Sequence, residues 1–299
     1  MAERWTARRI RELKGSRPIP VVTCYDWAMA KLCDAAELPV LLVGDSLGNV
    51  ILGHETTLPV TVDDMIHHAA AVMRAKPRAL VVVDLPFLSF QISPEEALRN
   101  AGRIVQASGA DAVKLEGGSR SAEAIRRIVE AGVPVMGHLG LTPQSVLEFG
   151  GYGVQGRGRA GDRLVDEARA LEQAGVFSLV LEKIPARLAE RITKAVGVPT
   201  IGIGAGAACD GQVLVLYDLL GLVPSFQPRF VKRYAEVGTL MVDALRRYVA
   251  EVTAGSFPGA EHAYGDEPEK APSAKRERVS TRSASRAPAS ARRPRGGRR

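Results

Sequence analysis

Eight short apolar runs rich in Val, Ile and Leu recur along this chain, and we expect a helical segment after each of them. The runs are PVVTCY (20–25), VLLVGD (40–45), ALVVVDLP (79–86), DAVKLEGG (111–118), VPVMGHLGL (133–141), SLVLEKI (178–184), VPTIGIGAG (198–206) and QVLVLYDLLGL (212–222). Continuous apolar runs are typical of strands that are buried on both faces, as in a parallel sheet covered by helices. The pattern therefore predicts an α/β fold with a parallel sheet.

The intervening segments carry helix start and stop signals. In SPEEALRNAGRIVQASG, Ser93 is placed to cap a helix, Pro94 takes its first position and Gly109 ends it. The segments GDRLVDEARALEQAG and PARLAERITKAVG repeat this scheme. These signals support the alternation of strands and helices.

Eight strand–helix units in roughly 250 residues match the size of a (β/α)8 TIM barrel, in which reacting groups lie at the carboxyl ends of the strands. An open, doubly wound sheet is the alternative, because strand count alone does not close a barrel. We assign residues 1–265 to the barrel domain.

The formal net charge of +7 is concentrated at the end of the chain. Residues 266–299 hold eleven Lys or Arg and four Asp or Glu, so the charges of residues 1–265 balance. This segment is built of Arg, Ser, Ala and Pro and has little to bury, which predicts a disordered tail. Such a tail is either a solvated extension, the interpretation we favour, or a non-specific contact to nucleic acid or anionic surfaces.

The cysteines and the apolar segments bear on location. Cys24, Cys33 and Cys209 are far apart and odd in number, which indicates a reducing compartment rather than a disulfide framework or a metal site. The first residues lack the apolar core of a signal peptide, and no apolar run approaches the roughly 18 residues of a membrane span. We expect a cytoplasmic protein with no membrane partner.

Polar side chains gather where the predicted strands end. Asp45, Asp84, His138 and Glu182 end or nearly end the second, third, fifth and sixth runs. Within the fourth run, Lys114 and Glu116 are two residues apart, so an extended backbone points both to one face. Charges that face a barrel interior must be balanced there, which predicts a site at this end.

Asp45, Asp84 and Glu116 are three carboxylates from neighbouring strands, and Lys114 is one compensating cation. A set of oxygen ligands that leaves positions for water and substrate is typical of Mg²⁺. The alternative is that Asp45 and Asp84 only cap the turns that follow them. We favour the metal, since both occur beside the KLE sequence.

For two further residues, the sequence leaves two interpretations open. Glu182 ends an apolar strand, where desolvation would suit a general base, although a salt bridge to Lys183 or to an arginine is equally consistent with the spacing. His138 is either a buried structural histidine or a contact to the ligand at its strand end.

These motifs together resemble the ketopantoate hydroxymethyltransferase family of the phosphoenolpyruvate/pyruvate barrel superfamily, from about residue 5 to 260. The resemblance is carried by TCYDWAMAKLCDAA, LLVGDSLGNVILGHETTLPVTVDDMIHHAAAV, DLPF, AVKLEGG, GHLGLTPQS, LVLEKIP and IGIGAGAACDGQVLVLYDLLG. The basic tail lies outside it, so the resemblance implies nothing about the tail.

The resemblance implies the roles of individual residues. Asp45 and Asp84 match the family's Mg²⁺ ligands, and Glu116 matches the third acidic residue of its metal site. Asp45, Ser46, Asp84 and Lys114 match the contacts to a 2-oxo acid, and His138 matches a site histidine. Glu182 matches the family's proton acceptor.

The implied reaction transfers a hydroxymethyl group from the co-substrate 5,10-methylenetetrahydrofolate to 3-methyl-2-oxobutanoate and gives ketopantoate, the precursor of pantothenate and coenzyme A. The resemblance also implies one Mg²⁺ per subunit and a homodecamer.

Two other functions compete with this one. A Mg²⁺-dependent lyase or mutase of the same superfamily would carry a cysteine in the loop after the fourth strand, where this chain reads EGGSRSAEA. A nucleic-acid-binding protein built on a barrel would need a basic, aromatic-bearing face, which the balanced charge of residues 1–265 does not favour.

Overall fold

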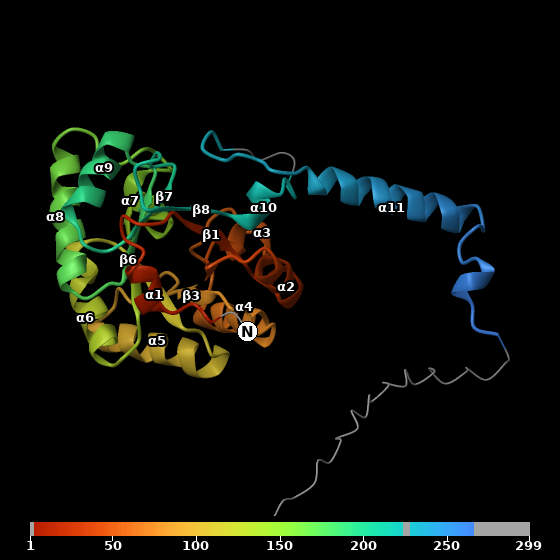
Figure 1. The fold of residues 1–299 in the computed structure, drawn as a ribbon, viewed down its shortest axis with the longest axis horizontal. Helices are drawn as coiled ribbons and strands as arrows, with labels where there is room; N and C mark the ends of the chain where they lie inside the picture. The colour runs from red at the N-terminus through yellow and green to blue at the C-terminus, as the bar shows by residue number, and fades with distance from the viewer. Residues whose placement is uncertain (1–2, 224–227, 266–299) are drawn as a thin grey trace, which may run out of the picture. The chain divides into compact units, whose positions relative to one another are not determined.

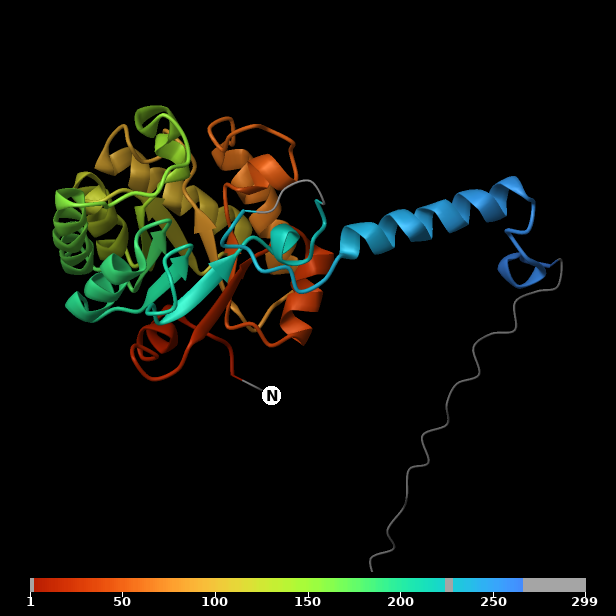
Figure 2. The ribbon, with the colours of Figure 1, turned by 90° about the horizontal axis from the view of Figure 1, so that it is seen from above.

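Eight parallel strands close into a barrel in the order in which they occur in the chain, with β8 paired to β1 (Figures 1 and 2). The computed structural model describes residues 3–223 and 228–265. The strands are β1 (Ile19–Thr23), β2 (Val40–Val43), β3 (Leu80–Asp84), β4 (Ala112–Glu116), β5 (Val135–Gly140), β6 (Ser178–Glu182), β7 (Thr200–Ile203) and β8 (Gly211–Leu214). Closure confirms the predicted TIM barrel and excludes the open doubly wound sheet.

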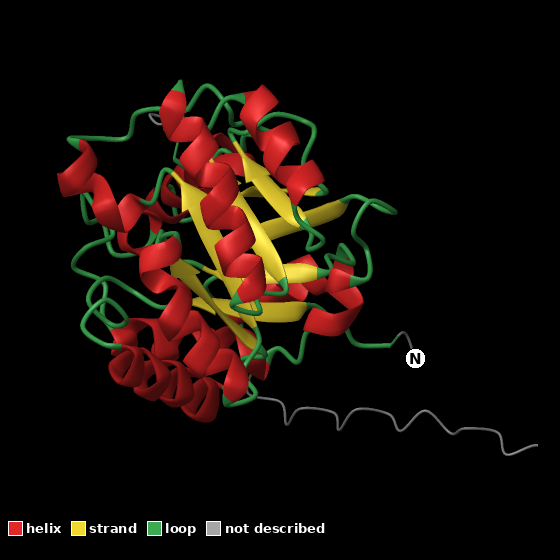
Figure 3. Cartoon of the chain, turned by 90° about the vertical axis from the view of Figure 1, so that its left-hand side faces the viewer, coloured by secondary structure: helices red, strands yellow, loops and turns green. Residues whose placement is uncertain are grey.

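Helices surround the strands (Figure 3). The α-helices are α1 (Ala7–Arg11), α2 (Trp27–Ala35), α3 (Leu47–Val50), α4 (Val62–Arg74), α5 (Pro94–Ser108), α6 (Ala122–Glu130), α7 (Val146–Phe149), α8 (Arg159–Gln173), α9 (Ala186–Ala195), α10 (Leu216–Leu219) and α11 (Val237–Thr253). Short 3-10 turns are η1 (Ser119–Ser121), η2 (Pro143–Ser145) and η3 (Ala260–His262).

The predicted capping signals of α5 are confirmed. The Ser93 hydroxyl accepts a hydrogen bond from the backbone N–H of Glu96, and Pro94 occupies the first turn. Gly109 ends the helix in the left-handed region at φ 78°, a conformation that favours glycine. Helix α9 lies within the predicted segment 185–197, whereas α8 begins at Arg159, two residues before the predicted segment 161–175, and ends within it.

The prediction of a helix after every strand is wrong at one place. β7 leads directly into β8 through residues 204–210, which contain no helix. The predicted run 212–222 also divides into the short strand β8 and helix α10. An apolar run of this length does not by its pattern alone distinguish a strand from a buried helical turn.

Alternate residues of each strand face the interior, so position along a strand determines which layer a side chain joins. Leu80 and Val82 of β3 pack in one cluster with Val40, Leu42 and Ala112, whereas Val81 and Val83 pack in the other cluster with residues of the helices. Ile10 of α1 packs in the first cluster and is fully buried. The interior series of β3 ends at Asp84, and that of β4 continues from Ala112 to Lys114 and Glu116.

The chain divides into two compact units, Met1–Leu245 and Arg246–Arg299, and the barrel lies in the first. The predicted tail, 266–299, lies outside the described residues. Within the ranges that are described, no helix is long and apolar enough to cross a membrane. Cys24, Cys33 and Cys209 are free cysteines.

Candidate functional site

The structure brings the predicted polar residues together at the carboxyl end of the barrel. Asp45, Asp84, Lys114, Glu116 and His138 are each at most 4% exposed. Strand pairing sets Asp84 beside Lys114 and Glu116 beside His138. Alternate residues of a strand face the same side, so Lys114 and Glu116 follow Ala112 on the interior face of β4. Both are buried, which agrees with the prediction that they share one face.

Asp84 connects the aspartate of the second strand to the lysine of the fourth. Its Oδ2 accepts a hydrogen bond from the backbone N–H of Asp45 at 3.0 Å. Its Oδ1 lies 3.1 Å from Lys114 Nζ in an ion pair, yet it receives no well-aligned hydrogen bond from the described residues. This oxygen is therefore buried with part of its accepting capacity unused.

His138 lies between two glutamates. Its Nδ1 is 3.4 Å from Glu116 Oε1, and its Nε2 is 3.3 Å from Glu182 Oε2. The same Nδ1 lies 3.2 Å from Lys114 Nζ. Glu182 pairs with His138, so the salt bridge to Lys183 that the sequence left open is not its contact here.

Ser46 and Tyr25 form the side of the site nearest α3. The Tyr25 hydroxyl and Ser46 Oγ lie 2.9 Å apart, and Tyr25 is fully buried. The backbone oxygen of Tyr25 is in turn 2.8 Å from His68 Nδ1, which gives that helix histidine a structural contact. Our sequence reasoning missed Tyr25, although it ends the first predicted run (20–25), and its place at a strand end is the signal that could have found it.

Gln144 is a second residue that sequence reasoning missed. Its Nε2 donates to Asp45 Oδ2 and to the backbone oxygen of Leu85, both at 2.9 Å. Its backbone N–H donates to Glu116 Oε2 at 3.0 Å. A single glutamine in the GLTPQ turn has no spacing signal that would mark it as part of a site.

The electrostatics show an excess of negative charge around Asp45 and Asp84. Burial raises the pKa of Asp45 to about 8, and the carboxylates of Asp84 and Glu116 add to the shift. Burial also raises the pKa of Asp84, against the opposing effect of Lys114. For Lys114, burial alone would lower the pKa, but Asp84, Glu116 and Asp45 raise it above its ordinary value. One lysine does not balance these three carboxylates.

The Glu116–His138 pair has the opposite tendency. Burial alone would raise the pKa of Glu116, but His138, Lys114 and the Gln144 amide hold it below its ordinary value. Burial and Lys114 would lower the pKa of His138, but Glu116 and Glu182 outweigh them and raise it. Both shifts are toward the charged form of the group.

The three predicted metal ligands, Asp45, Asp84 and Glu116, do not form one group. Among residues 3–223 and 228–265, no group of three or more His, Cys, Asp and Glu side chains lies closely enough to hold a metal ion. Glu116 is turned toward His138 and Gln144, away from a shared set with Asp45 and Asp84. Direct ligation by Glu116 therefore stays a prediction that this arrangement does not favour.

Asp45 and Asp84 nevertheless fit a Mg²⁺ ion, because Mg²⁺ in proteins is often held by one or two carboxylates, with substrate and water completing its shell. The accepting oxygen that Asp84 leaves unused, and the uncompensated charge around Asp45, both suit a divalent cation.

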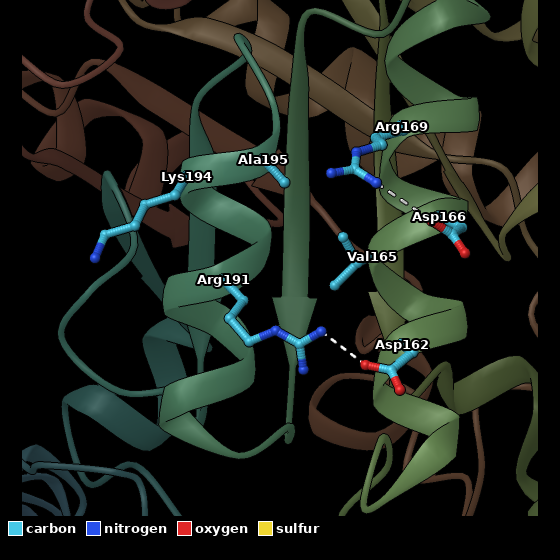
Figure 4. A pocket seen from close by; sticks show the side chains of 7 residues that line it. All are labelled: Asp162, Val165, Asp166, Arg169, Arg191, Lys194 and Ala195. Atoms are coloured by element: carbon cyan, nitrogen blue, oxygen red, sulfur yellow. Dashed lines mark hydrogen bonds and ion pairs between the residues drawn. The ribbon is translucent and has the colours of Figure 1, made fainter.

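Two hollows occur outside this cluster. One of about 400 Å³ lies between α8 and α9 (Figure 4), where Arg191 pairs with Asp162 at 2.7 Å and Arg169 with Asp166 at 3.4 Å. The other, of about 310 Å³, borders Gly117, Gly140 and Thr142. Neither is lined by a side chain of the strand-end cluster, so we place the chemistry at the cluster itself.

Comparison with known proteins places the chain in a family. The family model described as ketopantoate hydroxymethyltransferase matches residues 4–260. The 3-methyl-2-oxobutanoate hydroxymethyltransferase of Moorella thermoacetica is 57% identical over 252 residues, which are 84% of this chain and 93% of that protein. The enzyme of the same name from Trichlorobacter lovleyi is 54% identical over 248 residues, which are 83% and 93% of the two chains.

More distant solved structures share the fold. A 2,3-dimethylmalate lyase has a TM-score of 0.54 at 15% identity, covering 87% of this chain and 92% of its own. A phosphoenolpyruvate phosphomutase from Streptomyces platensis has a TM-score of 0.55 at 13% identity, covering 84% and 88%. At these identities the likeness concerns the barrel alone.

Proposed function

The chain belongs to the ketopantoate hydroxymethyltransferase family, and from this premise we propose a Mg²⁺-dependent reaction at the carboxyl end of its barrel. The chain is an enzyme that forms ketopantoate by hydroxymethyl transfer to 3-methyl-2-oxobutanoate. In our proposal the one-carbon unit comes from 5,10-methylenetetrahydrofolate. The observation that carries the proposal is the buried contact of Asp45, Asp84 and Lys114 beside the His138–Glu182 pair.

Asp45 and Asp84 would hold the metal. When bound, Mg²⁺ would supply Lewis-acid stabilisation of the negative charge that develops on the 2-oxo group as the C3 proton leaves. Lys114, which is charged and 3% exposed, would attract and orient the carboxylate of the 2-oxo acid. The Ser46 hydroxyl, held by Tyr25, would donate to the same substrate.

Glu182 would accept the proton from C3. Its side chain is 15% exposed, which makes it the most open of the paired carboxylates in the cluster. Its Oε2 lies 3.3 Å from His138 Nε2, a contact that would help to position the carboxylate as a general base. Over the whole reaction C3 gains a bond to the one-carbon unit, water supplies the hydroxyl, and tetrahydrofolate leaves.

Exchange of the C3 proton of 3-methyl-2-oxobutanoate into D₂O, followed by NMR with and without Mg²⁺, tests this proposal. We expect exchange that requires the metal and that falls by on the order of 100-fold or more in Glu182→Gln. Glu190→Gln, at an exposed position on α9, is the matched control and should exchange like the wild type. Equal exchange by folded, metal-loaded Glu182→Gln would remove the base role from Glu182.

Failure of the wild type to exchange would have one of two meanings. Exchange restored by adding 5,10-methylenetetrahydrofolate would show that proton removal waits for the co-substrate. No product with both substrates and Mg²⁺ would contradict the proposed reaction.

We also propose that the enzyme is a homo-oligomer, a decamer by the family resemblance, and that it acts in the cytoplasm. Leu240, Met241 and Leu245 of α11 are 67%, 52% and 61% exposed, which is unusual for large apolar side chains placed close together on one helix. A further copy of the chain would cover such side chains.

A further inference from the structure

Gln144 donates hydrogen bonds to three different parts of the barrel mouth. The side-chain amide reaches Asp45, at the end of β2, and Leu85, after β3. The backbone N–H reaches Glu116 at the end of β4, and Gln144 itself follows β5 in η2. The residue is 5% exposed, so these contacts are made away from solvent.

The orientation of the amide is determined by its partners. A backbone oxygen only accepts hydrogen bonds, so the atom facing Leu85 must be the Nε2 donor. Gln91 Nε2 donates to Gln144 Oε1 at 3.0 Å, which fixes the other end. Both N–H groups of Gln144 are then committed, one of them to Asp45.

A neutral amide suits this position beside Asp45. A lysine or arginine here would add a cation next to Asp45 and compete with any other cation for its carboxylate. A neutral donor occupies Oδ2 of Asp45 and leaves the charge of the carboxylate in place. Partners of this kind orient metal-binding carboxylates and typically affect metal affinity by roughly 10- to 100-fold.

We propose that Gln144, oriented by Gln91, is a positioning residue whose side-chain amide fixes the carboxylate of Asp45 for binding of the divalent cation, while its backbone N–H holds the carboxylate of Glu116 beside the site. The inference rests on the proposed function, because it names what supports the metal ligand of that site. Gln144 acts through these carboxylates and needs no contact with substrate.

The test is the affinity for the metal alone, measured with MgCl₂ by calorimetry and with MnCl₂ by electron paramagnetic resonance. Gln144→Met keeps the approximate volume of the side chain and removes its hydrogen bonds to Asp45 and Leu85. We expect it to weaken Mg²⁺ and Mn²⁺ binding by about 10-fold or more. Gln173→Met, at an exposed position at the end of α8, is the matched control and should bind as the wild type does.

Gln91→Leu provides a second variant, at an exposed position. We expect it to weaken metal binding by a few-fold, and the double variant to be no weaker than Gln144→Met, because Gln91 acts through Gln144. Independent, additive losses would contradict this order of action.

The outcomes separate the two proposals. Folded Gln144→Met that binds Mg²⁺ and Mn²⁺ like a metal-binding wild type would overturn the positioning role and leave the proposed function standing. Wild-type protein that binds neither metal would overturn the metal part of the proposed function, and the positioning role with it.

Discussion

The Lys114–Asp84 ion pair of the site is deeply buried, with both side chains 4% exposed and 3.1 Å between the charged atoms. Two charges taken out of water are stable only while each has its partner, so removing one partner leaves the other uncompensated. The pair therefore stabilises the fold, in addition to the substrate contact that we propose for it.

We expect Lys114→Met to lower the free energy of unfolding by about 3 kcal/mol in the absence of metal, since three carboxylates then lose their one lysine. The double variant Lys114→Met/Asp84→Asn should recover part of this loss, because it also removes one negative charge. Urea denaturation measures both. Lys194→Met, on the exposed face of α9, should change stability little. A Lys114→Met protein as stable as the wild type would contradict the account.

At this scale the sequence predicted residues whose chemistry is tied to strand ends. Asp84 and Lys114 could be found because a charged residue in an apolar strand has few explanations other than a site. Gln144 could not, since its role depends on Asp45, 99 positions away, and on a turn that places its amide. Glu116 was correctly placed in the cluster, but its turn toward His138 is set by packing that a sequence pattern does not contain.

Asp210 acts between elements at the amino end of the barrel. Its Oδ2 accepts from Lys14 Nζ at 2.9 Å and from the Thr200 N–H at 2.8 Å, and its Oδ1 accepts from the Gly15 N–H at 3.0 Å. Residues 14 and 15 lead into β1, Thr200 begins β7, and Asp210 precedes β8. One carboxylate thus joins the three strands at which the barrel closes.

This network gives stability a dependence on pH. Burial alone would raise the pKa of Asp210, but the Thr200 amide, Lys14 and the Gly15 amide hold it below its ordinary value. Its stabilising effect is therefore complete above the unfolded pKa, about 4, and is lost as pH falls through the lower folded pKa.

We expect Asp210→Asn to lower the free energy of unfolding by about 2 kcal/mol at pH 7, and this difference from the wild type to shrink as pH falls below about 4. Chemical denaturation of both proteins at several pH values between about 7 and 3 measures it. The exposed Asp166→Asn is the control. A difference that is constant over this range would show that ionisation of Asp210 is not the cause.

Elements were predicted best where local chemistry determines them. The α5 boundaries follow from Ser93, Pro94 and Gly109, each of which acts on its own backbone. The connection from β7 to β8 was predicted incorrectly. The general rule of one helix after each strand was applied there, although residues 204–210 carry no local helix signal. Closure of the sheet was predicted from the number of strand–helix units, but the residue pairs that close it, such as Ile19 with Gly211, were not.

Helix α11 carries large apolar side chains that are exposed. Met241 and Leu245 are four residues apart, which places them on one side of α11, and both are more than half exposed. Burying them between copies would remove apolar surface from water, which favours association.

We expect the wild type to have a mass in light scattering that is a multiple of its 32.0 kDa chain mass, ten-fold for the proposed decamer. Met241→Lys/Leu245→Lys should lower that mass, since charges disfavour burial. Thr239→Lys, exposed on the same helix, serves as the control. A wild type that scatters as a single chain would contradict the proposed assembly.

The alternation that takes β3 from Leu80 and Val82 to Asp84 makes the catalytic end sensitive to chain length. One residue inserted within β3 would turn Asp84 from the interior to the layer under the helices, whereas the same insertion in the loop after Leu85 would leave its direction unchanged. Insertions and deletions in this enzyme should therefore be tolerated between elements and eliminated within strands, independently of which residue is added.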